Sequence, residues 1–161
     1  SNDLNNTMMD IAVCDTCTLI QLRKGEILYC LNQLFTKVYL PPAVVAECQD
    51  AETLEEINKL NYCFKVQTAR YLLPVKLGPG EREAISLALE LGNAVFITDD
   101  ETAIKKAKQQ GLLTLRTHQI IMLAKWAGII PSAKTALDKM KAKGEGIQEN
   151  IYWQVLQDTG E

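Results

Sequence analysis

Five carboxylates stand at positions from which they could act together. Asp15, Asp99 and Asp100 each follow a short apolar run, while Glu47 and Glu81 lie in segments of helical pattern. Clustered acids repel one another, which raises their pKa values and costs stability. A hard divalent cation removes that repulsion, because Mg²⁺ and Mn²⁺ prefer oxygen ligands. Such an ion could activate water for attack on a phosphodiester and stabilise the leaving oxygen.

The hydropathy pattern predicts that strands and helices alternate along the chain. Short apolar or β-rich runs predict strands at 10–14, 37–41, 64–69, 94–98 and 112–117. Helical periods and stop signals predict helices at 25–35, 41–48, 52–60, 81–92, 100–111, 118–128, 132–144 and 149–157. Helices long enough for crossovers favour an α/β fold with a parallel sheet covered on both faces.

Ligands of such folds bind outside the carboxyl ends of the strands, where three of the acids are expected. Asp15 follows the first predicted strand, and Asp99 and Asp100 follow the strand at 94–98. Glu47 should face inward, because its neighbours at helical spacing are apolar, and Glu81 should sit above the apolar stripe of its helix. We therefore expect Asp15, Glu47, Glu81 and Asp100 to converge on one edge of the sheet, with Asp99 as an alternative member of the group.

Structural explanations exist for most of these acids taken singly. Asp15 could cap the segment "TLIQL", and Thr98 with Glu101 matches a capping box. Acids in the first turn of a helix are also favoured by its dipole. Only Glu47, on an apolar helix face, lacks an obvious structural reason. Their joint position at predicted strand ends favours a metal site.

A Cys14-x-x-Cys17 pair overlaps the first of these acids and could be a redox pair or half a zinc site. The chain has no second pair of this kind, and His118, its only histidine, lies about a hundred residues away. Cys14 belongs to the predicted strand and should be buried, unlike a redox pair at a helix start. The other cysteines, Cys30, Cys48 and Cys63, lie among apolar neighbours and should be buried, while His118 suits a surface or capping role.

Length and composition predict one domain over residues 10–161, preceded by a disordered lead or cloning remnant at 1–9. The chain has 161 residues, of which 47% are hydrophobic, and no apolar run reaches the roughly 18–20 residues of a membrane span. Five cysteines without a secretion signal suggest a reducing compartment, the cytoplasm. Residues 101–143 hold 9 Lys and Arg against 2 Asp and Glu. That segment suits either a phosphate-bearing partner or simply solvated helix faces.

From about Asp10 to Leu156, the order of the acidic motifs resembles the PIN-domain family of metal-dependent ribonucleases. "VCDTCTLI" resembles that family's D-x-S/N/T motif, and "PPAVVAEC" its P-x-x-V-x-x-E segment. "GEREAISLALELG" supplies a third acid, and "VFITDDETAIKKAKQQGL" the T-x-D element with Thr98 and Asp100. These last two segments, with "AKWAGII", are similar to a branch of predicted nucleic-acid-binding proteins that often resemble toxins of bacterial toxin–antitoxin pairs.

The resemblance implies a three-layer α/β/α sandwich, an Mg²⁺ or Mn²⁺ site, and endonucleolytic cleavage of RNA. It also implies frequent homodimers and a small antitoxin as partner. The catalytic residues would be Asp15, Glu47, Glu81 and Asp100. The metal ligands would be Asp15, Asp100, Glu81 and Asp99, with Thr16 and Thr98 holding them in place.

Basic residues in the 101–143 segment are candidates for contacts with the RNA backbone, which give affinity without sequence choice. They are Lys105, Lys106, Lys108, Arg116 and Lys125.

Two departures from the family pattern keep other functions open. Cys17 stands where the family has a small polar residue, for which Thr16 or Thr18 could substitute, and Glu81 is longer than the commoner aspartate. A PIN-like module without catalysis, binding nucleic acid or a protein partner, is therefore the alternative. A small phosphatase or nucleotide hydrolase is a third, although "GPGE" lacks the lysine and hydroxyl residue of a phosphate-binding loop.

Overall fold

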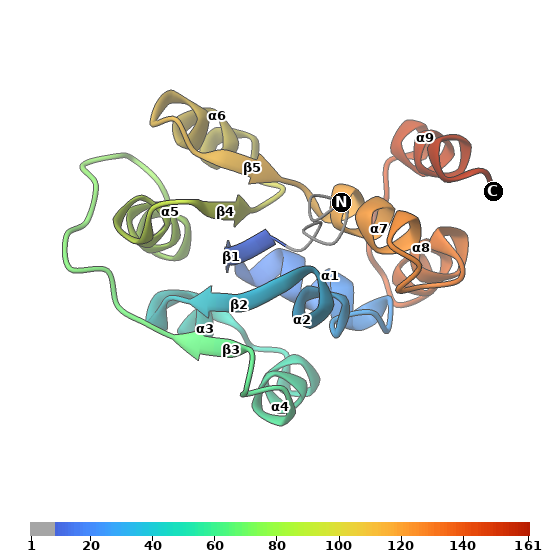
Figure 1. The fold of residues 1–161 in the computed structure, drawn as a ribbon, viewed down its shortest axis with the longest axis horizontal. Coiled ribbons are helices and arrows are strands. Elements are labelled where there is room, and N and C mark those ends of the chain that lie inside the picture. The colour runs from blue at the N-terminus through green and yellow to red at the C-terminus, as the bar shows by residue number, and fades with distance from the viewer. Residues whose placement is uncertain (1–8) are drawn as a thin grey trace, which may run out of the picture.

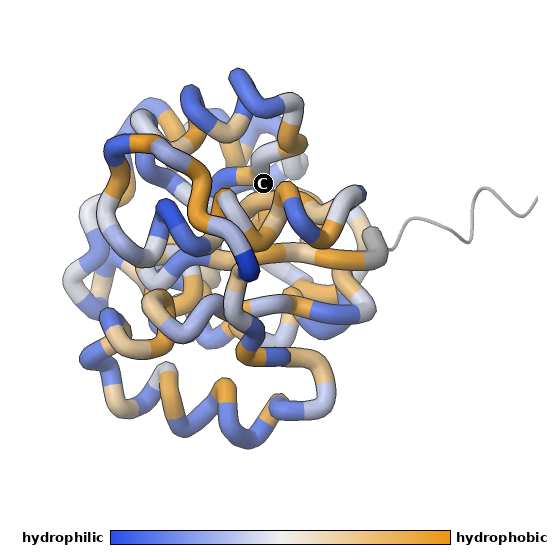
Figure 2. The backbone as a smooth tube through the Cα atoms, turned by 90° about the vertical axis from the view of Figure 1, so that its left-hand side faces the viewer, coloured by the Kyte–Doolittle hydropathy of each residue, from blue (hydrophilic) through white to orange (hydrophobic). Residues whose placement is uncertain are grey.

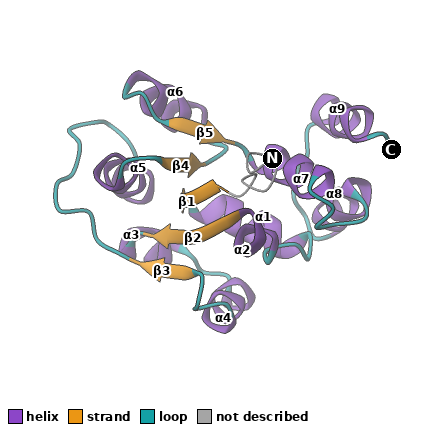
Figure 3. Cartoon of the chain, viewed as in Figure 1, coloured by secondary structure: helices purple, strands orange, loops and turns teal. Residues whose placement is uncertain are grey.

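The computed structural model describes residues 9–161, which form five strands and nine helices (Figures 1 and 3). The strands are β1 (Met9–Cys14), β2 (Phe35–Leu40), β3 (Phe64–Val66), β4 (Ala94–Ile97) and β5 (Leu113–Leu115). The helices are α1 (Thr16–Lys24), α2 (Cys30–Leu34), α3 (Pro42–Glu47), α4 (Ala51–Lys59), α5 (Pro79–Leu91), α6 (Glu101–Gln109), α7 (Thr117–Trp126), α8 (Ala133–Ala142) and α9 (Glu149–Thr159). Apart from Met9, the predicted lead lies outside the described residues.

The five strands make one sheet in the order β3-β2-β1-β4-β5, and every neighbouring pair is parallel. The chain moves outward from β1 to β3 and then returns past β1 to β4 and β5. Because parallel crossovers are right-handed, this reversal sends α5 and α6 to the face opposite α1. Accordingly, α5 contacts β1, β4 and α6, whereas α2 contacts β2 and α1 contacts α4. The predicted α/β/α sandwich is confirmed, and ligand sites of such sheets lie at this reversal.

The last three helices pack on one another and against the start of the chain. In Figure 1, α7, α8 and α9 gather at the right-hand end, and α7 and α8 both contact α1. The segment "IIMLAKWAGII" contributes mainly to this packing, since Ile120, Ile121 and Ala124 are fully buried. Its Trp126 is largely exposed. No helix within residues 9–161 is long and apolar enough to cross a membrane.

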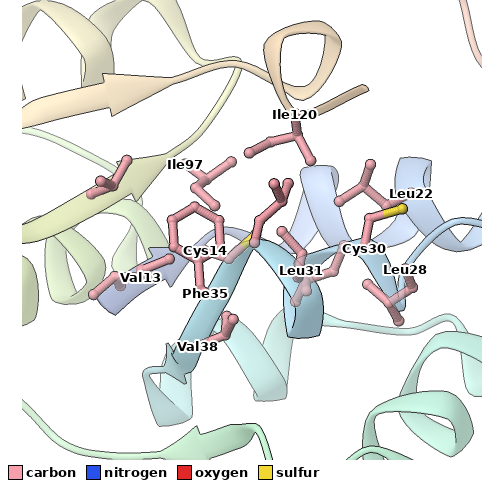
Figure 4. Close-up of a cluster of buried hydrophobic side chains, with 14 of the residues drawn as sticks. Val13, Cys14, Leu22, Leu28, Cys30, Leu31, Phe35, Val38, Ile97 and Ile120 are labelled. Atoms are coloured by element: carbon pink, nitrogen blue, oxygen red, sulfur yellow. The ribbon is translucent and has the colours of Figure 1, made fainter. Parts of the chain in front are cut away.

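The core forms on both sides of the central strands. All four residues of β4 are buried, as expected for a parallel strand covered by helices on both faces. Figure 4 shows Phe35, Ile97 and Ile120 meeting in one cluster, although they come from β2, β4 and α7. In Figure 2 the orange, apolar segments run through the middle of the molecule, and blue segments lie on its outer turns. This packing fixes the ends of β1 and β4 relative to each other.

The helix predicted at 25–35 is largely wrong. The chain turns through residues 25–29, α2 covers only five residues, and Phe35 already begins β2. Gly25 ends α1, and a Cβ there would lie 2.7 Å from Cε of Met140, so this turn is packed tightly against α8. Glu26 then takes a positive φ of 60°, which an α-helix does not allow. The other predicted elements are present with shifted ends.

Removing the Phe96 ring tests how far the sheet depends on this core. Phe96 is fully buried in β4, so Phe96→Ala should lower the free energy of unfolding by about 3–5 kcal/mol. Leu113→Ala, at a side chain that is 62% exposed, should cost less than about 0.5 kcal/mol. Urea unfolding followed by circular dichroism measures both, and equal losses would contradict the described core.

Candidate active site at the carboxyl edge of the sheet

Asp15 is a buried carboxylate at the end of β1, with only 5% of the residue exposed. It caps α1, where its Oδ1 accepts a hydrogen bond from the Thr18 backbone N–H at 2.9 Å. Its Oδ2 accepts a hydrogen bond from Thr98 Oγ1 at 2.5 Å. The Asp15 N–H donates to Ile97 O at 3.1 Å, which continues the pairing of β1 with β4. One side chain thus ties the start of α1 to the end of β4.

Burial sets the charge state of Asp15. It raises the pKa of this carboxyl from 3.8 to about 6, although the hydrogen bonds from Thr98 and Thr18 favour the ionised form. Ionised Asp15 therefore costs free energy in the metal-free protein. A cation beside it would offset that cost.

Asp99 fastens α7 to the sheet. Its Oδ1 accepts a hydrogen bond from Thr117 N at 2.9 Å, and its Oδ2 accepts one from Thr117 Oγ1 at 2.6 Å. The same Oδ2 also accepts from Gln21 Nε2 on α1 at 3.1 Å. Thr117 Oγ1 lies 3.0 Å from Thr18 Oγ1, so Asp99 and Asp15 are joined through two threonine residues. Asp99 is thus well partnered by the protein.

Asp100 is exposed and caps α6, with its Oδ1 accepting from Ala103 N at 2.7 Å. Thr98 Oγ1 accepts from Asp100 N at 3.2 Å while it donates to Asp15. Thr98 therefore links two of the four predicted metal ligands, Asp15 and Asp100. Since Asp100 is the capping residue, the predicted capping box of Thr98 with Glu101 is wrong.

Glu47 lies at the end of α3 and is exposed, so the expectation that it faces inward is wrong. The helix stops at Glu47, and the residue no longer shares a helical face with Cys48. Its Oε1 accepts from Gly80 N in the first turn of α5 at 2.8 Å. A Cβ on Gly80 would collide with the Glu47 carboxylate. Only glycine fits Gly80 while Glu47 keeps this position.

Glu81 also lies against the turn that begins α5. Its Oε2 is 2.6 Å from the place that a Cβ on Gly78 would occupy. Glu81 is partly exposed and lies in the first turn of the helix, as predicted.

Cys17 lies within range of several acids. Although the residue is exposed, partial burial of the thiol and then the charges of Asp15 and Glu81 raise its pKa to about 11, with smaller effects from Glu145 and Asp99. Burial likewise raises the pKa of the Cys14 thiol well above its ordinary value. Neither sulfur favours the thiolate that zinc binding or thiol redox chemistry needs. This edge therefore offers carboxylates rather than thiolates as ligands.

The donor set suits a hard cation, since Asp15, Glu81, Asp99 and Asp100 offer only oxygen. These acids are not assembled into a ligand cluster. No three His, Cys, Asp or Glu side chains within residues 9–161 are grouped closely enough to hold a metal ion. Asp15, Asp99 and Asp100 are turned toward N–H or O–H donors of the protein. An ion would have to compete with these hydrogen bonds.

The predicted RNA-contacting residues do not form one patch at this edge. Arg116 directly follows β5 and borders the edge, with Nη2 2.6 Å from Glu101 Oε1. The three lysines of α6, Lys105, Lys106 and Lys108, are exposed or partly exposed along that helix. Lys125 lies in the last turn of α7, far from its start, where it donates to Pro131 O at 2.8 Å.

Thr16 also differs from its predicted role, because its hydroxyl donates to Val44 O at 3.0 Å rather than to an acid. Sequence reasoning missed Gln21 and Thr117 and assigned Thr18 only as a substitute for Cys17. Thr117 follows β5 almost as Asp15 follows β1, so the strand-end rule could have found it. Gln21 carried no such signal, since only the fold brings it to Asp99.

A parallel sheet with acids at its central carboxyl edge defines an α/β protein of the kind that binds ligands at the strand reversal. The family model of DUF3368, a PIN domain, matches residues 11–161. This chain belongs to the PIN-domain family. PIN domains are generally nucleases and typically use divalent metal ions.

Two further comparisons add little. No curated protein matches the chain. The chain is similar to a solved structure of a PilT N-terminus domain protein from the hyperthermophilic archaeon Sulfolobus solfataricus P2. The two are 20% identical, with a TM-score of 0.45, and the match covers 68% of this chain and 89% of the other.

The raised pKa of Asp15 predicts a pH-dependent stability. Between about pH 4 and 6 the unfolded chain loses this proton while the folded protein retains it, so Asp15 lowers stability as pH rises through this window. The Asp15→Asn variant has no carboxyl group at this position, so it does not lose stability in this way. In EDTA, the stability of wild type relative to Asp15→Asn should therefore fall by about 3 kcal/mol between about pH 3.5 and about pH 7.5. Urea unfolding at each pH measures this, and a flat or rising difference would contradict the buried carboxylate.

A double-mutant cycle tests the contact between Glu47 and Gly80. Gly80→Ala should cost about 0.5–1.5 kcal/mol in wild type, because the new Cβ turns the exposed Glu47 carboxylate away and breaks its hydrogen bond to Gly80 N. In a Glu47→Ala background the same change should cost much less, since no carboxylate stands in the way. Urea unfolding of the four proteins gives the coupling energy. Additive losses would show that the two residues do not meet.

Proposed function

We propose that this chain is a metal-dependent endoribonuclease that hydrolyses RNA phosphodiester bonds with Mg²⁺ or Mn²⁺. The observation that carries the proposal is the buried Asp15 at the strand reversal, with its pKa raised by burial and with Asp99 and Asp100 following the neighbouring strand β4. Membership of a family of nucleases supports it. A buried carboxylate that is costly to ionise is explained if a cation completes its surroundings.

Asp15, Glu81 and Asp100 would hold the ion, with Asp99 beside them. When bound, such an ion activates water and stabilises the leaving oxygen of the phosphodiester. Thr98 fixes the positions of Asp15 and Asp100 relative to each other through its hydrogen bonds to both. Glu47 fixes the turn that presents Glu81 by binding Gly80 N. Asp99 and Thr117 hold α7 against the end of β4.

Cleavage of labelled single-stranded RNA with Mn²⁺ or Mg²⁺ tests this function. Wild type should cut, and Asp15→Asn should lose at least about a hundredfold in rate, because the ion loses a charged ligand. Asp158→Asn, which removes an exposed carboxylate from α9, should cut like wild type. EDTA should abolish the reaction. Equal cleavage by wild type and Asp15→Asn, or cleavage in EDTA, would contradict the proposal.

The catalytically inactive binding module remains the second candidate, because one observation favours it. The acids in residues 9–161 form no ready ligand cluster, and most of them accept hydrogen bonds from the protein. Such a module would bind RNA or a protein partner but give no metal-dependent cuts. Titration with Mn²⁺ separates the two, since only the nuclease needs the metal.

The toxin role, a cognate antitoxin, a homodimer and a cytoplasmic location stay predictions. They come from the resemblance or, for the location, from cysteine usage.

A further inference from the structure

A cavity of about 270 Å³ opens directly beside the acidic edge. Gln21, Asp99 and Thr117, which join α1, β4 and α7, form its near wall. Its far side is made by α8, by the loop before α9 and by α9 itself. In Figure 1 these helices lie together at the right-hand end, beyond α1. The cavity therefore continues the candidate active site toward the C-terminal helices.

The floor of the cavity is apolar. Ile147 and Ile151 are partly exposed and form its apolar surface. Leu137 and Met140 of α8 and Ile121 of α7 also border the cavity, but they are at most 1% exposed and so support this surface rather than contact a ligand. Small-molecule sites commonly have volumes of about 300–1,000 Å³, so this space suits one ring system rather than a whole nucleotide.

The charges around the cavity are already paired. Both oxygens of Asp99 accept hydrogen bonds from Thr117, and Glu101 is bound by Arg116. A phosphate placed inside would meet two carboxylates and one arginine that Glu101 already pairs, so the net effect is repulsion. A cationic side chain would gain little, because the acids already have partners, and it would be buried against apolar residues.

The rim offers hydrogen bonds without net charge. Burial lowers the pKa of His118, so its imidazole is neutral at pH 7 and provides one donor and one acceptor. Gln148 adds an amide that can donate and accept. An apolar floor with such a rim matches a nucleobase, whose faces are apolar and whose edge is polar.

We propose that this cavity binds one unpaired nucleobase of the RNA, next to the phosphodiester at the acidic edge. The inference rests on the proposed function and adds a preference for one base at a fixed position relative to the cut. The backbone of the RNA would pass Arg116 at the mouth of the cavity.

Binding without cleavage tests the cavity separately from the nuclease. In EDTA, the Asp15→Asn protein is titrated by fluorescence anisotropy with short single-stranded RNAs that differ at one central base. One base should bind about tenfold more tightly than the weakest, the effect expected from one recognised base. Ile151→Trp in the same background fills the cavity and should remove this preference. Leu113→Trp, at an exposed position near the other end of β5, is the matched control and should keep it.

Circular dichroism melting checks that each variant is folded. If Ile151→Trp does not fold, Ile147→Trp fills the cavity from the loop before α9 instead. A preference that survives filling of the cavity in a folded variant, or no preference in the Asp15→Asn parent, overturns the base site. If wild type still cuts RNA with metal, the nuclease stands and only the base site fails. If no RNA binds and wild type does not cut, both proposals fail. If the cavity binds a side chain of a protein partner and no RNA base, the base site is overturned as well.

Discussion

The hydrogen bonds of the buried Asp15 carboxylate are the constraint on which the rest of this site depends. Asp15 stands where the strand order reverses, so the backbone of β1 is bonded to strands on both sides. Its two oxygens bind the start of α1 and the end of β4, and the price is a pKa raised to about 6. Two further contacts extend from these bonds, from Thr18 to Thr117 of α7 and from Thr98 to Asp100 at the start of α6.

This arrangement explains how one residue can serve both folding and chemistry. A carboxylate that caps a helix stabilises the fold, and the same carboxylate at a strand reversal faces any bound ligand. Asp99 and Asp100 likewise accept hydrogen bonds that orient a helix. The structural and catalytic interpretations of these acids are therefore compatible. The acids accept hydrogen bonds from backbone N–H groups and threonine hydroxyls, and the edge keeps its acidic side chains.

Most of the architecture could be predicted from the sequence, because buried parallel strands are short apolar runs and their helices have clear stop signals. Asp15, Asp99 and Asp100 could be placed for the same reason, since they directly follow strands. The failures were local. Glu47 lies past the last helical turn of α3, a boundary that periodicity does not fix, and the turn at Gly25 depends on Met140 of a distant helix. Gln21 and the cavity beside Asp99 could not be predicted, because they depend on how α7, α8 and α9 pack.

A crystal grown with Mn²⁺ shows whether this acidic edge is a metal site. Anomalous diffraction at the manganese edge locates the ion without reference to activity. We predict a peak bound by Asp15 and by at least one of Glu81 and Asp100, with these side chains turned away from the hydrogen bonds described above. A fully occupied peak elsewhere, or no peak at saturating Mn²⁺ with Asp15 still bound only by Thr18 and Thr98, would contradict this prediction.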